Sequence, residues 1–128
     1  MNIFDISDID FSEDKEITEI LALSENIRIE RIVSSGQITD KDYWYDQSEN
    51  EFVMVLQGEA RILFDNGKEE HLSKGDYLEI PAHVRHQVSF TSVNPVCIWL
   101  TVYLGKAEKT GETGETGKTG EIGEIINS

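Results

Sequence analysis

Short segments in which apolar and polar residues alternate dominate this chain from residue 26 to residue 104. The first of them, NIRIERIVS at residues 26–34, alternates isoleucine with charged residues and then becomes largely apolar. Further segments of this kind stand at residues 51–57, 60–64, 69–72, 77–80 and 86–91, and a nearly continuous apolar run follows at 96–104. Alternation predicts strands buried on one face, and the last run predicts a strand buried on both faces.

Turn-forming residues separate these segments at regular intervals. Gly58 follows one predicted strand, Asn66-Gly67 is a strong hairpin signal because both positions tolerate positive φ, and Gly75 marks another turn. About eight short strands joined by such turns favour an all-β fold, an antiparallel β-sandwich or barrel closed as a jelly roll.

The two ends of the chain differ from this pattern. In residues 1–25, Ser12 is a suitable N-cap, acidic residues follow it, and apolar residues recur at helical spacing (Ile17, Ile20 and Leu21). We therefore expect a short helix from Ser12 to about Leu23, followed by a barrel over residues 26–104. Residues 105–128 are rich in Gly, Glu, Thr and Lys, with glycine at every third position from 111 to 123 and no proline. This composition predicts a flexible low-complexity tail.

Charge and composition narrow the range of partners. The formal net charge of -14 argues against binding to nucleic acid or to anionic membranes, because both need clustered lysine and arginine. No apolar run approaches the roughly 20 residues of a membrane span, and the acidic N-terminus does not resemble a secretory signal, so we expect a cytoplasmic protein. The single cysteine, Cys97, lies in an apolar run and is expected to be a small buried side chain.

Two polar residues stand on strand faces that are otherwise apolar. Glu51 shares a face with Val53 and Val55, and His86 shares a face with Val88 and Phe90. A buried charge needs a partner or a cation. Carboxylate and imidazole together suit a divalent metal ion such as Zn, Fe, Mn or Ni, and the residues alone do not choose among these metals.

The spacing around these two residues resembles the two motifs of the cupin superfamily. Glu51 to Gly58 reads EFVMVLQG, and Gly75 to His86 reads GDYLEIPAHVRH. In cupins the first motif supplies a histidine pair and a glutamate to a metal, and the second supplies one more histidine. The resemblance implies a small single-domain cupin barrel with Glu51 and His86 as metal ligands.

The first motif is degenerate in this chain, because WYDQSENE stands where the histidine pair is expected. One spacing places Trp44 and Asp46 at the ligand positions, and of these only Asp46 can bind a metal. The other spacing places Tyr45 and Gln47 there. The sequence leaves both open, so Asp46 and Gln47 are candidate ligands and Tyr45 is a candidate pocket residue.

Three further residues bear on the site. His83 stands where the second motif has a glycine, and we treat it as a candidate catalytic residue that moves a proton. Arg31 shares a face with Ile27 and Ile29, so it is a candidate pocket residue, although a paired surface charge is the alternative. His71, in a polar hairpin strand, is expected at the surface.

Two functions fit these observations. The first is a metal-dependent enzyme, an oxygenase, isomerase or lyase that acts on a small polar metabolite inside the barrel. The second is a non-catalytic barrel that binds a small ligand with a structural metal or with none. In either case we expect a homodimer, because a jelly roll has edge strands to cover and the N-terminal segment has apolar residues without an evident partner: Ile3, Phe4, Ile6, Ile9 and Phe11.

Overall fold

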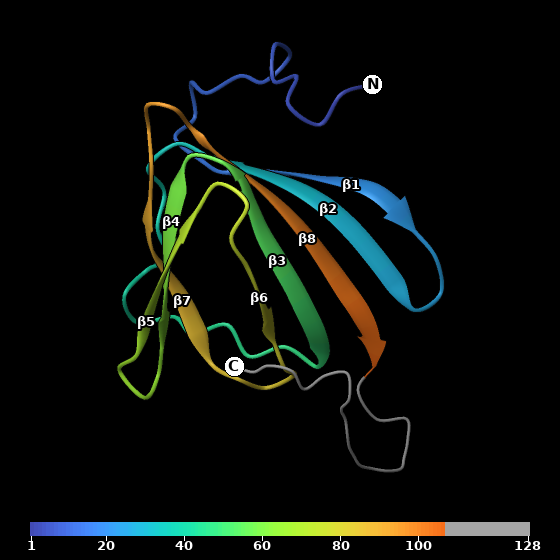
Figure 1. Ribbon diagram of the computed structural model, residues 1–128, viewed down its shortest axis with the longest axis vertical. Coiled ribbons are helices and arrows are strands. Elements are labelled where there is room, and N and C mark those ends of the chain that lie inside the picture. The colour runs from blue at the N-terminus through green and yellow to red at the C-terminus, as the bar shows by residue number, and fades with distance from the viewer. Residues whose placement is uncertain (107–128) are drawn as a thin grey trace.

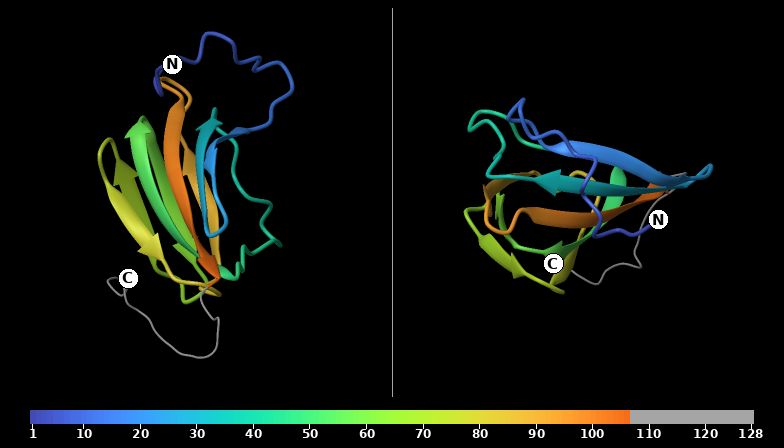
Figure 2. Two further views of the ribbon diagram at one scale, coloured as in Figure 1. Left: turned by 90° about the vertical axis from the view of Figure 1, so that its right-hand side faces the viewer. Right: turned by 90° about the horizontal axis from the view of Figure 1, so that it is seen from above.

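The structure, a computed structural model, describes residues 1–106, which form two facing antiparallel sheets (Figures 1 and 2). One sheet has five strands in the order β1-β2-β8-β3-β6, and the other has three in the order β5-β4-β7. The strands are β1 (Ile17–Leu23), β2 (Ile27–Ser34), β3 (Glu49–Gln57), β4 (Glu59–Phe64), β5 (Glu69–Ser73), β6 (Tyr77–Ile80), β7 (His86–Thr91) and β8 (Cys97–Lys106). The predicted all-β jelly roll is confirmed. Most of the predicted tail, residues 107–128, lies outside the described residues.

The short N-terminal helix predicted from Ser12 to Leu23 is wrong. Its second half forms β1, which pairs antiparallel with β2 along the edge of the larger sheet. A register shift between Ile20 and Ala22 marks a bulge, and the extra residue places apolar side chains at a spacing that resembles a helical one. Residues 1–106 contain no helix, and so none that is long and apolar enough to span a membrane.

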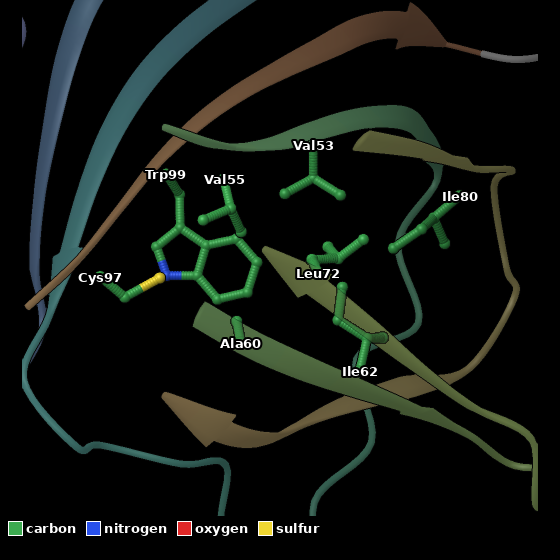
Figure 3. Packing of buried hydrophobic residues seen from close by; sticks show 8 residues of the cluster. All are labelled: Val53, Val55, Ala60, Ile62, Leu72, Ile80, Cys97 and Trp99. Atoms are coloured by element: carbon green, nitrogen blue, oxygen red, sulfur yellow. The ribbon is translucent and has the colours of Figure 1, made fainter. Parts of the chain in front are cut away.

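The hydrophobic core lies between the two sheets (Figure 3). Val53 and Val55 of β3 and Trp99 of β8 face Ala60 and Ile62 of β4, and all five are almost completely buried. Cys97 is also buried, as expected, and burial raises the pKa of its thiol to about 12. The sulfur is therefore a packing group rather than a nucleophile at neutral pH.

Arg31 holds the N-terminal segment against the outer face of β2. Its Nη1 donates hydrogen bonds to the carbonyl oxygens of Ile3 at 3.0 Å and Asp5 at 2.8 Å, and its Nε donates to Glu19 at 2.6 Å. The expectation that Arg31 reaches the barrel interior is therefore corrected. Strand alternation correctly places Arg31 and Ile27 on the same face of β2. This face is the outer one, where Ile27 stays exposed.

Candidate functional site

Two buried polar side chains meet inside the barrel. Glu51 on β3 is 8% exposed and His86 at the start of β7 is 5% exposed. Nδ1 of His86 lies 2.8 Å from the carbonyl oxygen of Val84, an acceptor, so Nδ1 carries a proton and Nε2 is turned toward Glu51. Nε2 and Glu51 Oε1 are 3.6 Å apart, which is too far for a good hydrogen bond. Among residues 1–106, Oε1 has no hydrogen-bond partner.

A cavity of about 160 Å³ adjoins this pair. Its apolar wall includes Val53, Ile62 and Trp99 from the core. Its polar lining, beyond Glu51 and His86, comes from three strands (β1, β2 and β8) and from the loops before β1 and β3: Glu16, Thr18, Glu30, Tyr45, Gln47, Thr101 and Tyr103. Glu51 and His86 are therefore accessible to a small molecule that enters the barrel.

The loop before β3 positions two of these side chains. Tyr45 and His86 exchange backbone hydrogen bonds of 2.8 and 3.1 Å, and the Tyr45 ring stacks on the imidazole with centroids 5.5 Å apart. Because alternate residues of an extended segment face the same side, Gln47 also lines the cavity. Of the two pairs that the sequence left open, Tyr45 and Gln47 are therefore the pair that lines the cavity.

Asp46 and His83 lie outside the cavity. They contact each other, with Asp46 Oδ1 2.7 Å from His83 Nδ1, and their side chains are 48% and 66% exposed. The alternation that turns Gln47 inward turns Asp46 outward. The expectations that Asp46 joins Glu51 as a ligand and that His83 moves a proton in the barrel are corrected by this placement.

His83 has a backbone φ of 65°. This left-handed conformation favours glycine, the residue that the second motif has at this position, because a Cβ there is crowded. We predict that His83→Gly is more stable than His83→Ala by about 1 kcal/mol in urea unfolding, since both variants lose the contact with Asp46 and only one keeps the Cβ. Ala82→Gly, where φ is not positive, should instead lower stability. Equal stability of the two His83 variants would contradict this account of the turn.

Sequence reasoning missed the acidic residues of the cavity. Glu30 lies on the inner face of β2 with Ile32, and Arg28 donates to it at 2.8 Å and also bonds Glu49. The alternation in NIRIERIVS contains this signal, but the more apolar side of the strand, which suggests an inner face, is the outer one. Thr101 was hidden in an apolar run, where a single hydroxyl group gives no sign of its role.

The cavity shifts the proton affinity of its titratable groups. Burial alone would lower the pKa of His86, but Glu51 and the Val84 carbonyl together outweigh it, so the pKa is raised above 6.5. Burial, with smaller contributions from nearby carboxylates, raises the pKa of Tyr45 and Tyr103. Burial and the charge of Glu30 raise the pKa of Glu16, although a hydrogen bond from Ser34 opposes them. This environment disfavours additional negative charge.

Comparison with known proteins connects this geometry to a family. Residues 31–103 match the family described as the cupin domain. A crystal structure from Ralstonia eutropha JMP134, of a protein provisionally named a mannose-6-phosphate isomerase, is 34% identical, with a TM-score of 0.75 over 82% of this chain and 96% of that one. The chain belongs to the cupin superfamily.

Two further solved structures share the fold at lower identity. A cupin superfamily protein from Desulfitobacterium hafniense DCB-2 is 25% identical, with a TM-score of 0.64 over 78% of this chain and 86% of that one. A DMSP lyase from Ruegeria pomeroyi DSS-3 is 17% identical, with a TM-score of 0.61 over 73% of this chain and 49% of that one, and this likeness shows the fold alone. No curated protein matches the chain.

The donor set of this cupin fits a metal ion only in part. Among the described residues, no group of three or more His, Cys, Asp or Glu side chains is placed to hold a metal. Glu51 and His86 supply two strong donors, and Gln47 and Tyr45, candidates for the first-motif positions, line the same cavity. Oε1 of Glu51, which lacks a hydrogen-bond partner among the described residues, could bind a cation, but an amide and a phenol are weaker ligands than two imidazoles.

Proposed function

We propose that this cupin binds a small polar metabolite in its barrel and that Glu51 and His86 move a proton on it, as an isomerase or a lyase does. The observation that carries the proposal is Oε1 of Glu51, which has no hydrogen-bond partner among residues 1–106 and faces His86 Nε2 at 3.6 Å beside an accessible cavity. A buried polar atom without a partner costs about 1–3 kcal/mol. A bound ligand would supply the missing partner and offset this cost.

The roles follow from the hydrogen bonds around the pair. The bond from Nδ1 to Val84 fixes the ring, so Nε2 is the nitrogen that exchanges a proton with a ligand. With its pKa raised, His86 stays protonated to a higher pH than an ordinary histidine, which suits it to act as a general acid. Glu51 accepts a proton or stabilises the imidazolium, and the Gln47 amide can donate and accept bonds that orient the ligand.

The similarity to the Ralstonia eutropha protein supports isomerase chemistry for this chain, but the cavity does not suit a sugar phosphate as the substrate. A phosphorylated sugar needs arginine or lysine to bind its phosphate, and among the described residues neither type lines the cavity. The alternative to an enzyme is a barrel that binds the same metabolite without changing it. Proton exchange between the ligand and solvent separates these two functions.

The test begins with the ligand. Small molecules released from natively purified protein are identified by mass spectrometry and are then incubated with the protein in D₂O. Wild type should catalyse deuterium incorporation at a carbon of the ligand, His86→Asn should lose it, and His71→Asn, a surface control, should retain it. A ligand that binds without deuterium exchange would indicate a binding protein rather than an enzyme. The absence of any ligand would contradict the proposal.

A divalent metal is the second candidate, favoured by one observation. Metal-binding histidines usually donate their other ring N–H to a fixed acceptor, as His86 does to Val84. Glu51, His86 and Gln47 would then hold Zn, Fe, Mn or Ni, which would supply Lewis-acid chemistry or, for iron, oxygen chemistry. We predict a rise in melting temperature with Zn²⁺ that is lost in His86→Ala and unchanged in Asp46→Ala. A rise that survives in His86→Ala would place the metal elsewhere.

We also propose that the protein is a homodimer through the edge of β1. This edge strand carries exposed apolar side chains, with Ile20 57% and Leu23 68% exposed. Light scattering should give twice the chain mass of 14.5 kDa at micromolar concentration. The double variant Ile20→Lys, Leu23→Lys should be monomeric, whereas Ile38→Lys, at another exposed apolar residue, should not change the mass. Wild type at the mass of one chain would contradict the proposal.

A further inference from the structure

The charges around the barrel cavity restrict the kind of ligand that it can hold. Three carboxylates line it, from Glu16, Glu30 and Glu51, and among the described residues no lysine or arginine does. The Arg28 guanidinium is engaged by Glu30, Glu49 and the ring of Tyr103, 4.2 Å from its centroid. His86 is thus the one cationic side chain of the described lining, and an anionic ligand would face more repulsion than attraction.

Two buried polar atoms of the cavity lining form no hydrogen bond among the described residues. Oε1 of Glu51 and Oγ1 of Thr101 are buried without a hydrogen-bond partner among residues 1–106, and the two residues are 8% and 1% exposed. A carboxylate oxygen only accepts hydrogen bonds, and a hydroxyl group can accept as well. Both atoms would be satisfied by a ligand that brings N–H donors. An ammonium group brings three such donors together with the charge that the carboxylates lack.

The size and the walls of the cavity fit a small organic cation. A volume of about 160 Å³ is close to the ~150 Å³ that accommodates benzene, so the buried part of the ligand has roughly five to seven non-hydrogen atoms. Tyr45, Trp99 and Tyr103 contribute aromatic rings to the lining. Aromatic rings attract cations as well as apolar carbon, so an alkyl chain with a charged end suits such walls.

We infer that the ligand of this barrel is a small primary amine, bound as its ammonium ion to Glu51 and Thr101. The inference rests on the proposed function, because it names the chemical class of the metabolite that the cavity binds. It differs from a phosphorylated or carboxylated ligand in charge, and it needs no metal ion to fill the site.

Calorimetry with three matched probes tests whether the cavity selects a positively charged ligand. The probes are n-butylammonium, 1-butanol and butyrate, which share a chain length and differ in the charge of their polar end. Titrations contain EDTA to remove metal ions and about 0.15 M salt to screen surface charges. We expect n-butylammonium to bind at least about tenfold more tightly than 1-butanol, and butyrate not to bind.

Variants assign the binding to the cavity. Glu51→Gln should reduce the affinity for n-butylammonium to that for 1-butanol, and Thr101→Val, which preserves the shape of the side chain, should weaken it several-fold. Glu25→Gln removes an exposed carboxylate from the β1–β2 turn and should change nothing. If Glu51→Gln does not fold, the affinity of Thr101→Val for n-butylammonium decides whether the amine binds in the cavity.

Two results would overturn the inference. If butyrate or 1-butanol binds at least as tightly as n-butylammonium, the ligand is not recognised by a positive charge. The barrel would still be a ligand-binding one. Amine binding that neither cavity variant weakens would place the cation on the acidic surface. The proposed proton transfer is judged separately by the released metabolite and its deuterium exchange, so the failure of one claim is distinguishable from the failure of the other.

Discussion

Replacing Glu51 with glutamine is expected to slow proton transfer in the cavity strongly and to lower the pKa of His86 below 6.5. In the wild type, Glu51 and the Val84 carbonyl outweigh burial, which is the largest single influence on this histidine. Without the carboxylate, burial dominates and favours the neutral imidazole. Because a positioned acid or base contributes about 10²- to 10⁴-fold, the deuterium exchange rate should fall by a factor in this range. Proton NMR of the imidazole ring measures the pKa.

The same pair predicts how stability depends on pH. A histidine whose pKa is higher in the folded state stabilises the fold below its unfolded pKa, and this contribution is lost as pH rises through the folded pKa. The stability difference between wild type and His86→Asn should therefore shrink as pH rises above about 6.5. In the Glu51→Gln background the sign should reverse, with the contribution of His86 lost as pH falls. An unchanged pKa of His86 in Glu51→Gln would contradict the coupling.

Gly58→Ala is expected to cost about 3 kcal/mol of unfolding free energy, which combines backbone strain with overpacking. Gly58 has a φ of 80°, and an added Cβ would lie 2.5 Å from Ser92 Oγ and 2.8 Å from the Val96 carbonyl oxygen. Ser92 cannot move freely, because its hydroxyl group accepts from the Glu59 amide and donates to Pro95. For a domain stabilised by about 5–15 kcal/mol, this loss is large.

Gly75→Ala is the matched control for this substitution. Gly75 has a φ of 88°, but an added Cβ would meet no atom within 4 Å. Only backbone strain of about 1 kcal/mol should therefore appear. Urea unfolding of both variants measures the difference. Equal losses would mean that the packing around Gly58 is looser than the structure shows.

The sequence predicted the barrel well because strand alternation and turn chemistry are local. Glu51 and His86 could be paired in advance because each stood alone on an apolar face. The bulge in β1 gives its apolar residues a spacing like that of a helix. The outer face of β2 carries apolar residues such as Ile27, so its sequence resembles that of an inner face. The positions of Glu30 and Arg31 follow from which face meets the second sheet, and this depends on contacts between distant segments.

The most direct test of the Glu51 and His86 site is the NMR spectrum of the three histidine rings while the metabolite released from the protein is added back to ligand-free protein. We expect the resonances of His86 to shift with saturation, those of the surface residue His71 to stay unchanged, and the shift to vanish in Glu51→Gln. If the metabolite binds while the His86 resonances do not move, the cavity at Glu51 and His86 is not the functional site of this cupin.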